Sequence, residues 1–143
     1  MPRDKHKLKI LFLCTGNACR SQIAHGWAEY LKSDIVEVYS AGIRPIGVNP
    51  WAIKIMAEAG VDISDYKSEC VDEFADVKFD YVITLCDAAA GNCPIFPAKV
   101  TVIHKPFKDP YYAEGSEEEI MAVFRKVRDQ IREFVETIPE SLD

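Results

Sequence analysis

The chain is organised around the stretch LKILFLCTGNACRS at residues 8–21. Residues 8–13 are an apolar run that predicts a buried strand, and a helical pattern begins near Gln22. The loop between them starts at Cys14 and reaches Arg20. A strand, a tight loop and a helix in this order are typical of proteins built on a parallel sheet.

This loop has the residues of a cradle for one tetrahedral oxyanion. Successive backbone N–H groups can converge on an anion, and the start of the helix adds its partial positive charge. Gly16 permits close approach of the backbone, Asn17 tolerates a positive φ, and Arg20 can hold two anion oxygens at once. We therefore expect the anion to be bound by Thr15, Gly16, Asn17, Ala18, Cys19 and Arg20.

Cys14 stands at the start of the cradle and is the candidate nucleophile. The positive field of the loop should favour its thiolate form, and Ser21 can donate a hydrogen bond to that thiolate. The alternative is a buried structural cysteine in an ordinary turn between strand and helix. Such a cysteine rarely comes with this whole surrounding set of residues.

Length and composition are those of one globular domain, residues 1–143, with frayed tails at 1–6 and 139–143. The net charge of −6 argues against a nucleic-acid partner, and no apolar run is long enough to cross a membrane. Because the chain shows no export signal, we expect a cytoplasmic protein. Its five cysteines are then expected to serve chemistry rather than a disulfide scaffold.

The rest of the chain alternates strands and helices. Further strands are expected at residues 35–40, 79–85 and 100–103, and helices at 22–32, 49–60 and 69–75. This alternation predicts an α/β fold of three layers, in which helices cover both faces of a four-stranded parallel sheet. Active sites of such sheets lie at the carboxyl ends of the strands, where Cys14 and Cys86 both stand.

The last helix has the clearest pattern. Ser116 and Glu119 predict a capping box at its start. Apolar residues then repeat at helical spacing, at Ile120, Phe124, Val127, Ile131, Phe134 and Ile138. Basic residues lie off that stripe and are expected to form a solvated face, made of Arg125, Lys126, Arg128 and Arg132.

The loop sequence Cys-Thr-Gly-Asn-x-Cys-Arg-Ser-Gln at residues 14–22 resembles the signature of the low-molecular-weight protein tyrosine phosphatases. It also resembles that of their relatives, the thioredoxin-coupled arsenate reductases, and is closer to the reductase version. The resemblance runs from about Lys7 to Val135 and implies the low-molecular-weight phosphatase fold. Phosphate and arsenate have nearly the same shape and charge, so the loop alone does not separate the two activities.

Two further cysteines favour the reductase. Thr84-Leu85-Cys86 and Asn92-Cys93-Pro94 resemble the redox segment of the arsenate reductases, which the phosphatases lack. The resemblance implies that Cys14 attacks arsenate, that Cys86 displaces arsenite from it, and that Cys93 then forms a disulfide for thioredoxin to reduce. Phosphate and sulfate would compete as oxyanions. A metal site or unrelated core cysteines are the alternatives, but the spacing is not that of a zinc site, and we expect neither metal nor cofactor.

The phosphatase stays open as the alternative activity. Asp109-Pro110 follows the last strand, where a carboxyl group can protonate a leaving oxygen or take a proton from a nucleophile, although Asp before Pro also forms ordinary turns. Both families carry Asp-Pro here, and Tyr111-Tyr112 resembles the paired tyrosines of the phosphatases. A phosphatase would use Cys14, Arg20 and Asp109. A non-catalytic oxyanion-binding or redox-sensing module would not need Asp109.

Some arsenate reductases hold a potassium ion beside residues that correspond to His25 and Lys67. Asn17, Ser40 and Glu69 are suitable ligands, but a lysine would itself supply the positive charge, so we expect no bound potassium ion. The two remaining cysteines are expected to be inert: Cys19 should point away from the anion, and Cys70 has no assignable partner.

The segment from Cys86 to Cys93 must change shape if these residues form a disulfide. An unbroken helix would separate them by about 10.5 Å, whereas a disulfide needs Cα atoms roughly 4.4–6.8 Å apart. Residues 87–90 can make one turn of helix, whereas Gly91 and Asn92 weaken it and Pro94 limits its extension. We therefore predict that residues 86–94 are locally helical when reduced and loop out when oxidised, with the sheet unchanged.

Overall fold

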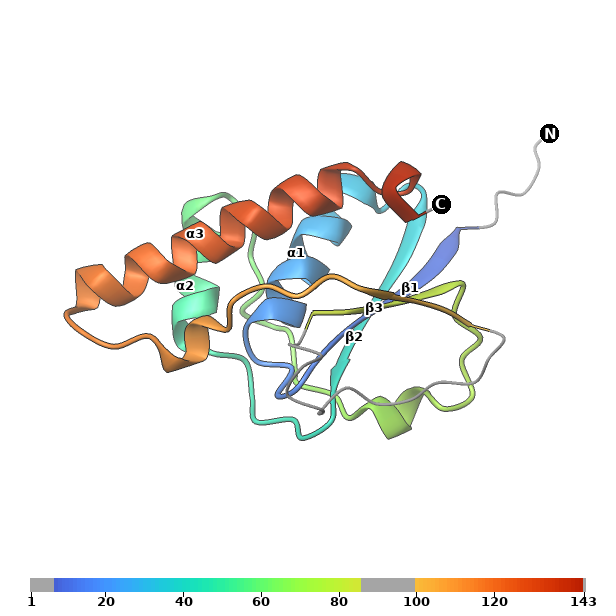
Figure 1. The fold of residues 1–143 in the computed structure, drawn as a ribbon, viewed down its shortest axis with the longest axis horizontal. Coiled ribbons are helices and arrows are strands. Elements are labelled where there is room, and N and C mark those ends of the chain that lie inside the picture. Colours follow the sequence, from blue (N-terminus) through green and yellow to red (C-terminus); the bar gives the residue numbers. More distant parts are fainter. Residues whose placement is uncertain (1–6, 86–99, 143) are drawn as a thin grey trace.

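A parallel sheet forms the centre of the protein in the computed structural model, which describes residues 7–85 and 100–142 (Figure 1). Over these residues the sheet has four strands in the order β2-β1-β3-β4, and neighbouring strands run parallel. The strands are β1 (Leu8–Cys14), β2 (Val36–Gly42), β3 (Tyr81–Thr84) and β4 (Thr101–His104). The expected four-stranded parallel sheet is confirmed.

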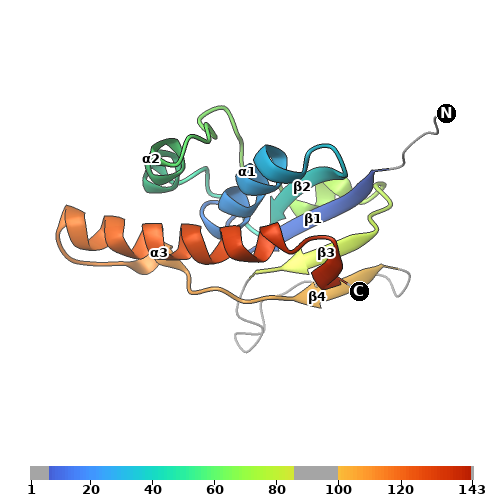
Figure 2. The ribbon, with the colours of Figure 1, turned by 90° about the horizontal axis from the view of Figure 1, so that it is seen from above.

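Helices account for most of the remaining described chain. The longer ones are α1 (Arg20–Lys32), α2 (Pro50–Glu58) and α3 (Glu117–Glu136), and the 3₁₀ turns are η1 (Val71–Phe74), η3 (Pro110–Tyr112) and η4 (Glu140–Leu142). Helices α1 and α3 pack against each other over one face of the sheet, and α2 packs on both of them (Figures 1 and 2).

Successive residues of β1 bury their side chains on opposite faces of the sheet, as the pleat requires. Ile10 and Phe12 belong to the main core, together with Trp27 of α1 and Phe124 of α3. The alternate residues Leu11 and Leu13 enter a second, smaller core on the other face. Among residues 7–85 and 100–142, the helical element that covers this second face is the short turn η1, whose Phe74 packs against the core.

The helix ends match their sequence signals. The Asn49 side chain accepts a hydrogen bond from the Trp51 N–H at 2.8 Å, with Pro50 in the first helical position of α2. Gly60 ends that helix region with a φ of +89°, which glycine adopts without strain. The capping box of Ser116 and Glu119 is present, and the backbone N–H of Ser116 lowers the pKa of the Glu119 carboxyl.

The buried side of α3 is broader than the predicted stripe. Met121 and Val135 are buried beside Phe124, Val127 and Ile131. The outer members of the predicted stripe, Ile120 and Phe134, are only half-buried and pack at the edge of the core. Because α3 contacts both α1 and α2, residues next to the stripe are covered as well.

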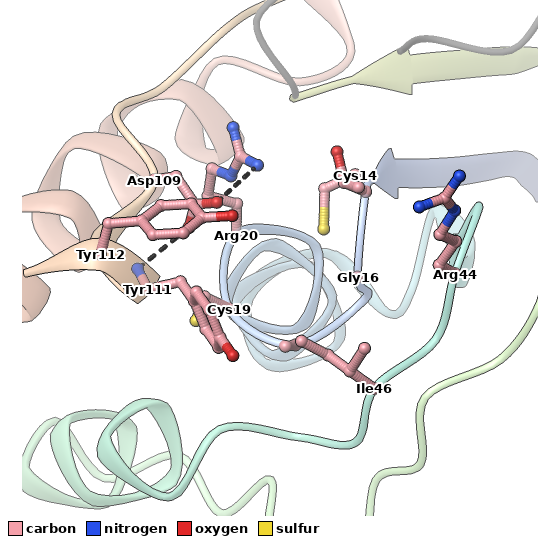
Figure 3. Close-up of a pocket in the computed structure, with 11 residues that line it drawn as sticks. Cys14, Gly16, Cys19, Arg20, Arg44, Ile46, Asp109, Tyr111 and Tyr112 are labelled. Carbon is pink, nitrogen blue, oxygen red and sulfur yellow. Dashed lines mark hydrogen bonds and ion pairs between the residues drawn. The ribbon is translucent and has the colours of Figure 1, made fainter.

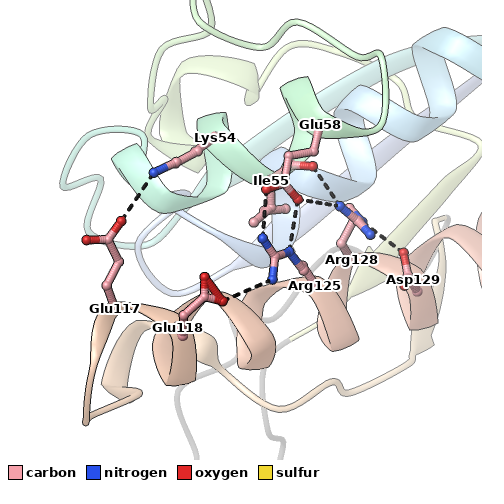
Figure 4. A network of polar contacts seen from close by, with 8 residues as sticks. All are labelled: Lys54, Ile55, Glu58, Glu117, Glu118, Arg125, Arg128 and Asp129. Atoms are coloured by element: carbon pink, nitrogen blue, oxygen red, sulfur yellow. Dashed lines mark hydrogen bonds and ion pairs between the residues drawn. The ribbon is translucent and has the colours of Figure 1, made fainter.

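The prediction of a solvated basic face on α3 is wrong for Arg125 and Arg128. Arg125 donates to both carboxylate oxygens of Glu58 at 3.0 and 2.9 Å, and its hydrogen bond lowers the pKa of Glu58. Arg128 donates to the Ile55 carbonyl at 2.9 Å (Figure 4). Both arginines lie over the carboxyl end of α2, which has no basic residue in its own last turn. Cations are favoured there by the helix dipole.

The carboxyl-terminal tail also differs from expectation. Residues 139–142 are not frayed, because η4 turns the chain back and Leu142 is buried in the main core. The expected amino-terminal tail, residues 1–6, and Asp143 lie outside the described residues. Across the described part of the chain, no helix is both long enough and apolar enough to span a membrane.

Candidate functional site

The predicted oxyanion loop connects the carboxyl end of β1 to the start of α1 and forms one wall of a pocket of about 210 Å³ (Figure 3). Strand β1 lies between β2 and β3, and the carboxyl ends of such central strands are where open α/β sheets bind ligands. The pocket is lined by Cys14, Thr15, Gly16, Ala18, Cys19, Arg20, Arg44, Ile46, Asp109, Tyr111 and Tyr112.

Backbone carbonyl groups of the oxyanion loop accept hydrogen bonds from a neighbouring loop. Those of Thr15, Gly16 and Ala18 accept hydrogen bonds from N–H groups in the 43–49 loop at 2.9 to 3.1 Å. A Cβ atom on Gly42 would lie 2.8 Å from the Thr15 oxygen, so only glycine allows this close packing. A short loop whose carbonyls are engaged outward can turn its N–H groups inward, as an anion-binding loop requires.

Asn17 links the loop to its surroundings and orients Ser21. Its φ of +50° confirms the predicted left-handed conformation. The Asn17 Oδ1 accepts from the Glu69 N–H at 2.7 Å, which fixes Nδ2 as the atom that donates to Ser21 Oγ at 2.6 Å. Because Ser21 Oγ accepts that bond, its own proton is free to point at Cys14 Sγ, 2.9 Å away. The predicted Ser21–Cys14 contact is confirmed.

Gln22 and Ser68 also hold the loop in place, a role that was not predicted from the sequence. Gln22 Nε2 and Ser68 Oγ both donate to the Asn17 carbonyl, at 3.1 and 2.6 Å. Nothing in the local pattern indicates that the partner of Ser68 lies 51 residues earlier in the chain.

Arg20 is buried at the back of the pocket. Its Nη1 donates to the carbonyls of Leu85 and Phe107 at 3.0 and 3.2 Å, and its Nη2 donates to Asp109 Oδ2 at 3.2 Å. Its Nε is buried and has no hydrogen-bond partner among residues 7–85 and 100–142. A buried unpaired N–H costs free energy, and a bound oxyanion would satisfy it.

Asp109 and the two tyrosines form the opposite side of the pocket. Asp109 Oδ1 accepts from the Tyr111 N–H at 3.0 Å, which caps the turn η3 and fixes the carboxylate beside Arg20. Tyr111 and Tyr112 are exposed, with ring centroids 5.0 Å apart in an edge-on arrangement. The structure thus brings Cys14, Arg20 and Asp109 together around one pocket (Figure 3).

The other cysteines fall into two groups. Cys19 is buried, burial raises the pKa of its thiol, and its sulfur lies apart from that of Cys14 (Figure 3). Cys70 is half-buried and forms a β-bridge with Gly42. The predicted redox pair, Cys86 and Cys93, and the predicted change of shape over residues 86–94 lie outside the described residues.

Arg44 and Ile46 line the pocket, although the sequence analysis did not single them out. They follow the carboxyl end of β2, and that placement was the available signal, since neighbouring parallel strands end at the same edge. In the structure the 43–49 loop is tied to the cradle by backbone hydrogen bonds.

A second cavity, of about 290 Å³, is lined by four of the five residues considered for potassium, all except Asn17. His25 Nδ1 lies 2.7 Å from Ser40 Oγ, and burial lowers the pKa of His25, which favours its neutral form. Lys67 lines the same cavity as Glu69. A lysine in the donor set does not fit a cation site, because it places a second positive charge there. In the described ranges no group of three or more His, Cys, Asp or Glu side chains is arranged to hold a metal ion.

Comparisons with known proteins agree with this geometry. Residues 9–143 match the family described as low molecular weight phosphotyrosine protein phosphatase. An arsenate reductase of Halalkalibacterium halodurans is 48% identical over 136 residues, covering 95% of this chain and 98% of that protein.

Two solved structures show the same fold. An arsenate reductase in the phosphate binding state has a TM-score of 0.76 at 31% identity and covers 95% of this chain and 99% of its own. A thioredoxin-dependent arsenate reductase of Corynebacterium glutamicum has a TM-score of 0.68 at 29% identity, covering 94% of this chain and 63% of its own. The chain therefore belongs to the low molecular weight phosphotyrosine protein phosphatase family and has arsenate reductases among its relatives.

Proposed function

We propose that this protein reduces arsenate to arsenite with electrons from thioredoxin. The observation that carries the proposal is the Cys14 sulfur held by the Ser21 hydroxyl at 2.9 Å, in a pocket that also contains Arg20. The names of its relatives support arsenate as the oxyanion, and one of these is called thioredoxin-dependent. We place the reaction in the cytoplasm, where thioredoxin keeps thiols reduced.

The first step is attack of the Cys14 thiolate on arsenic. A sulfur–arsenic bond forms, and one arsenate oxygen leaves as water after protonation. Arg20 and the loop N–H groups would hold the remaining oxygens, and the unpaired Arg20 Nε supports that role. Asp109, at the pocket wall, is the candidate donor of the proton.

The next two steps carry the electrons. Cys86 attacks the Cys14 sulfur and forms a Cys14–Cys86 disulfide. The sulfur–arsenic bond breaks with its electron pair staying on arsenic, and arsenite leaves with arsenic reduced by two electrons. Cys93 then attacks Cys86, which frees Cys14 and forms the Cys86–Cys93 disulfide. The thioredoxin dithiol reduces this disulfide and is itself oxidised. Cys86 directly follows Leu85, whose carbonyl binds Arg20, and this sequence position supports the proposal.

A phosphotyrosine phosphatase is the second candidate. It is favoured by Tyr111 and Tyr112, which border the pocket beside Asp109 and offer an aromatic entrance. In that reaction Cys14 would form a phosphocysteine and Asp109 would act as general acid for the leaving phenol.

Paired turnover assays separate these candidates. The first follows NADPH oxidation with arsenate, thioredoxin and thioredoxin reductase, and the second follows hydrolysis of an aryl phosphate. A reductase turns over arsenate in the first assay, and a phosphatase turns over only the aryl phosphate in the second. Turnover of neither would leave an oxyanion-binding or redox-sensing module and overturn the proposal.

Cysteine variants test the relay itself. Cys86→Ala and Cys93→Ala should abolish thioredoxin-coupled turnover and leave any aryl phosphatase activity intact, because both cysteines act after the oxyanion has reacted. Cys70→Ala is the matched control, since Cys70 lies outside the residues that line the pocket. Wild-type arsenate turnover by both relay variants would show that these cysteines are structural.

A further inference from the structure

Arg44 stands on the rim of the pocket, across from Asp109 and the two tyrosines (Figure 3). Its position is set by the backbone, because the Arg44 N–H donates to the Thr15 carbonyl at 2.9 Å and the Ile46 N–H donates to the Gly16 carbonyl at 3.1 Å. The root of this side chain is therefore fixed to the oxyanion loop, while the side chain itself is exposed.

The guanidinium of Arg44 differs from that of Arg20 in what it contacts. Arg20 is buried, and its charge is partly compensated by Asp109 at 3.2 Å and by two backbone carbonyls. Within residues 7–85 and 100–142, no hydrogen bond or ion pair engages the Arg44 guanidinium. Of the two cationic side chains that line the pocket, the one at the rim is thus the one available to an incoming ligand.

The charge of the whole molecule makes such a group useful. The net charge is −6, so the protein repels a dianion at long range. Screening limits this repulsion to about 8 Å at physiological ionic strength. Within that distance an uncompensated guanidinium attracts a tetrahedral dianion and can hold two of its oxygens in a bidentate fork.

We propose that Arg44 captures the oxyanion substrate at the mouth of the pocket and passes it to the loop and Arg20. The inference rests on the proposed function only in naming arsenate as that substrate. Arg44 acts here on binding and entry and not on the reacting atoms, because its side chain is at the rim while Cys14 is buried.

Steady-state kinetics of Arg44→Gln test the capture role. The kcat/KM for arsenate should fall by up to about tenfold at low salt, the lower end of the range for electrostatic steering because only one charge is removed, while kcat is unchanged. The difference from wild type should shrink between about 20 and 300 mM ionic strength, because salt screens the attraction. Arg44→Lys should retain most of the effect, and Arg44→Glu should lower kcat/KM further.

Lys78→Gln is the matched control. It removes one positive charge from an exposed residue just before β3, at the amino ends of the strands and therefore at the opposite edge of the sheet. Its kcat/KM should equal that of wild type at every salt concentration. An equal loss in Lys78→Gln and Arg44→Gln would show that net charge alone is responsible and would overturn the proposal.

A second measurement does not depend on turnover. Inorganic phosphate should protect Cys14 from alkylation by iodoacetamide, with the modified cysteine identified by peptide mass. Arg44→Gln should raise the phosphate concentration for half-protection by the same factor as it lowers kcat/KM. If wild type fails to reduce arsenate, the proposed function is lost, and this measurement still decides the role of Arg44.

Two further results would overturn the proposal. One is unchanged half-protection and unchanged kcat/KM for arsenate in Arg44→Gln. The other is a change confined to the KM for thioredoxin, which would assign Arg44 to contact with the reductant protein instead.

Discussion

Ser21 is the residue through which the surroundings of the loop act on Cys14. Its hydroxyl accepts from Asn17 and lies 2.9 Å from the Cys14 sulfur, and Asn17 is in turn held by the backbone of Glu69. A hydroxyl that donates to sulfur stabilises a thiolate, because charge-assisted hydrogen bonds are stronger than neutral ones. The chemistry of one cysteine therefore depends on a loop more than 50 residues later in the chain.

Replacing Cys14 by serine should remove both arsenate reduction and any aryl phosphatase activity, since each reaction begins with this thiolate. The two turnover assays check this directly, with Cys70→Ser as the control. Substantial turnover of either substrate by the Cys14→Ser protein would show that another group starts that reaction.

Ser21→Ala should slow alkylation of Cys14 by about tenfold at neutral pH, as expected if the lost hydrogen bond contributes about 1.5 kcal/mol to the thiolate. The measurement is the pH dependence of the iodoacetamide reaction, with Ser33→Ala, an exposed site at the end of α1, as control. A Ser21→Ala rate equal to that of wild type would mean that the hydroxyl serves only to pack the loop.

At this scale the sequence allowed Gly16, Asn17 and Arg20 to be predicted, because a tight loop before a helix restricts which residues fit. Ser68 and Arg44 could not be assigned in the same way. The Ser68 hydroxyl and the Arg44 N–H both donate to backbone carbonyls of the loop. Every residue has a backbone carbonyl, so the sequence does not indicate which one accepts these bonds.

Arginine side chains of α3 bind the carboxyl end of α2, so polar as well as apolar contacts hold these two helices together. Arg128 caps a carbonyl at the end of α2, and Arg125 binds Glu58 in the same turn (Figure 4). The periodicity of α3 correctly predicted a helix with a buried side. It could not show which exposed positions meet another helix, because the spacing of basic residues is the same on a solvated face and on a contacting one.

Ser116→Ala should destabilise the protein by about 1 kcal/mol, the usual cost of losing an N-cap. The Ser116 hydroxyl accepts from the Glu119 N–H at 3.2 Å, and α3 spans 20 residues that contribute to the main core. Urea unfolding measures the change. Ser116→Asp, which keeps an acceptor, should stay near wild type, and equal destabilisation by both variants would contradict the capping account.

At the scale of the whole molecule, the pocket lies at one edge of the sheet, where the alternation of strands and helices predicts a ligand site. The pocket draws residues from the loops after β1, β2 and β4, which are far apart in the sequence. His25 of α1 lines the second cavity, where it contacts Ser40 of β2 and the ring of Tyr66. His25 therefore links three segments that surround the site.

Stability should fall as the pH drops below about 6.5, the ordinary His pKa, because burial lowers the pKa of His25 in the folded state. Between the folded and unfolded pKa values the unfolded chain binds the extra proton, so acid favours unfolding, and above 6.5 the contribution is fully present. The test is to measure the thermal unfolding of wild type and of His25→Gln at several pH values between about 5 and 7 and to compare how much stability each protein loses. The variant should lose less stability on acidification.

Glu29→Gln should change the pH dependence of stability in the opposite direction to His25→Gln. Glu29 raises the pKa of His25 and so works against the effect of burial. Removing its charge should lower the folded-state pKa further and steepen the loss of stability in acid. A shallower pH dependence in Glu29→Gln would show that a group other than His25 is responsible.

Helix α1 begins at Arg20, its N-cap residue Cys19 makes no side-chain capping hydrogen bond, and its first turn has no acidic residue. Its first N–H groups thus lack the partners that most helices carry, and a bound oxyanion supplies what the sequence omits. Ligand binding and folding are then linked quantities: phosphate at about one hundred times its Kd should add about 2.7 kcal/mol to the unfolding free energy. Melting curves in phosphate and in an amine buffer would differ accordingly, so the choice of buffer decides which stability is being measured.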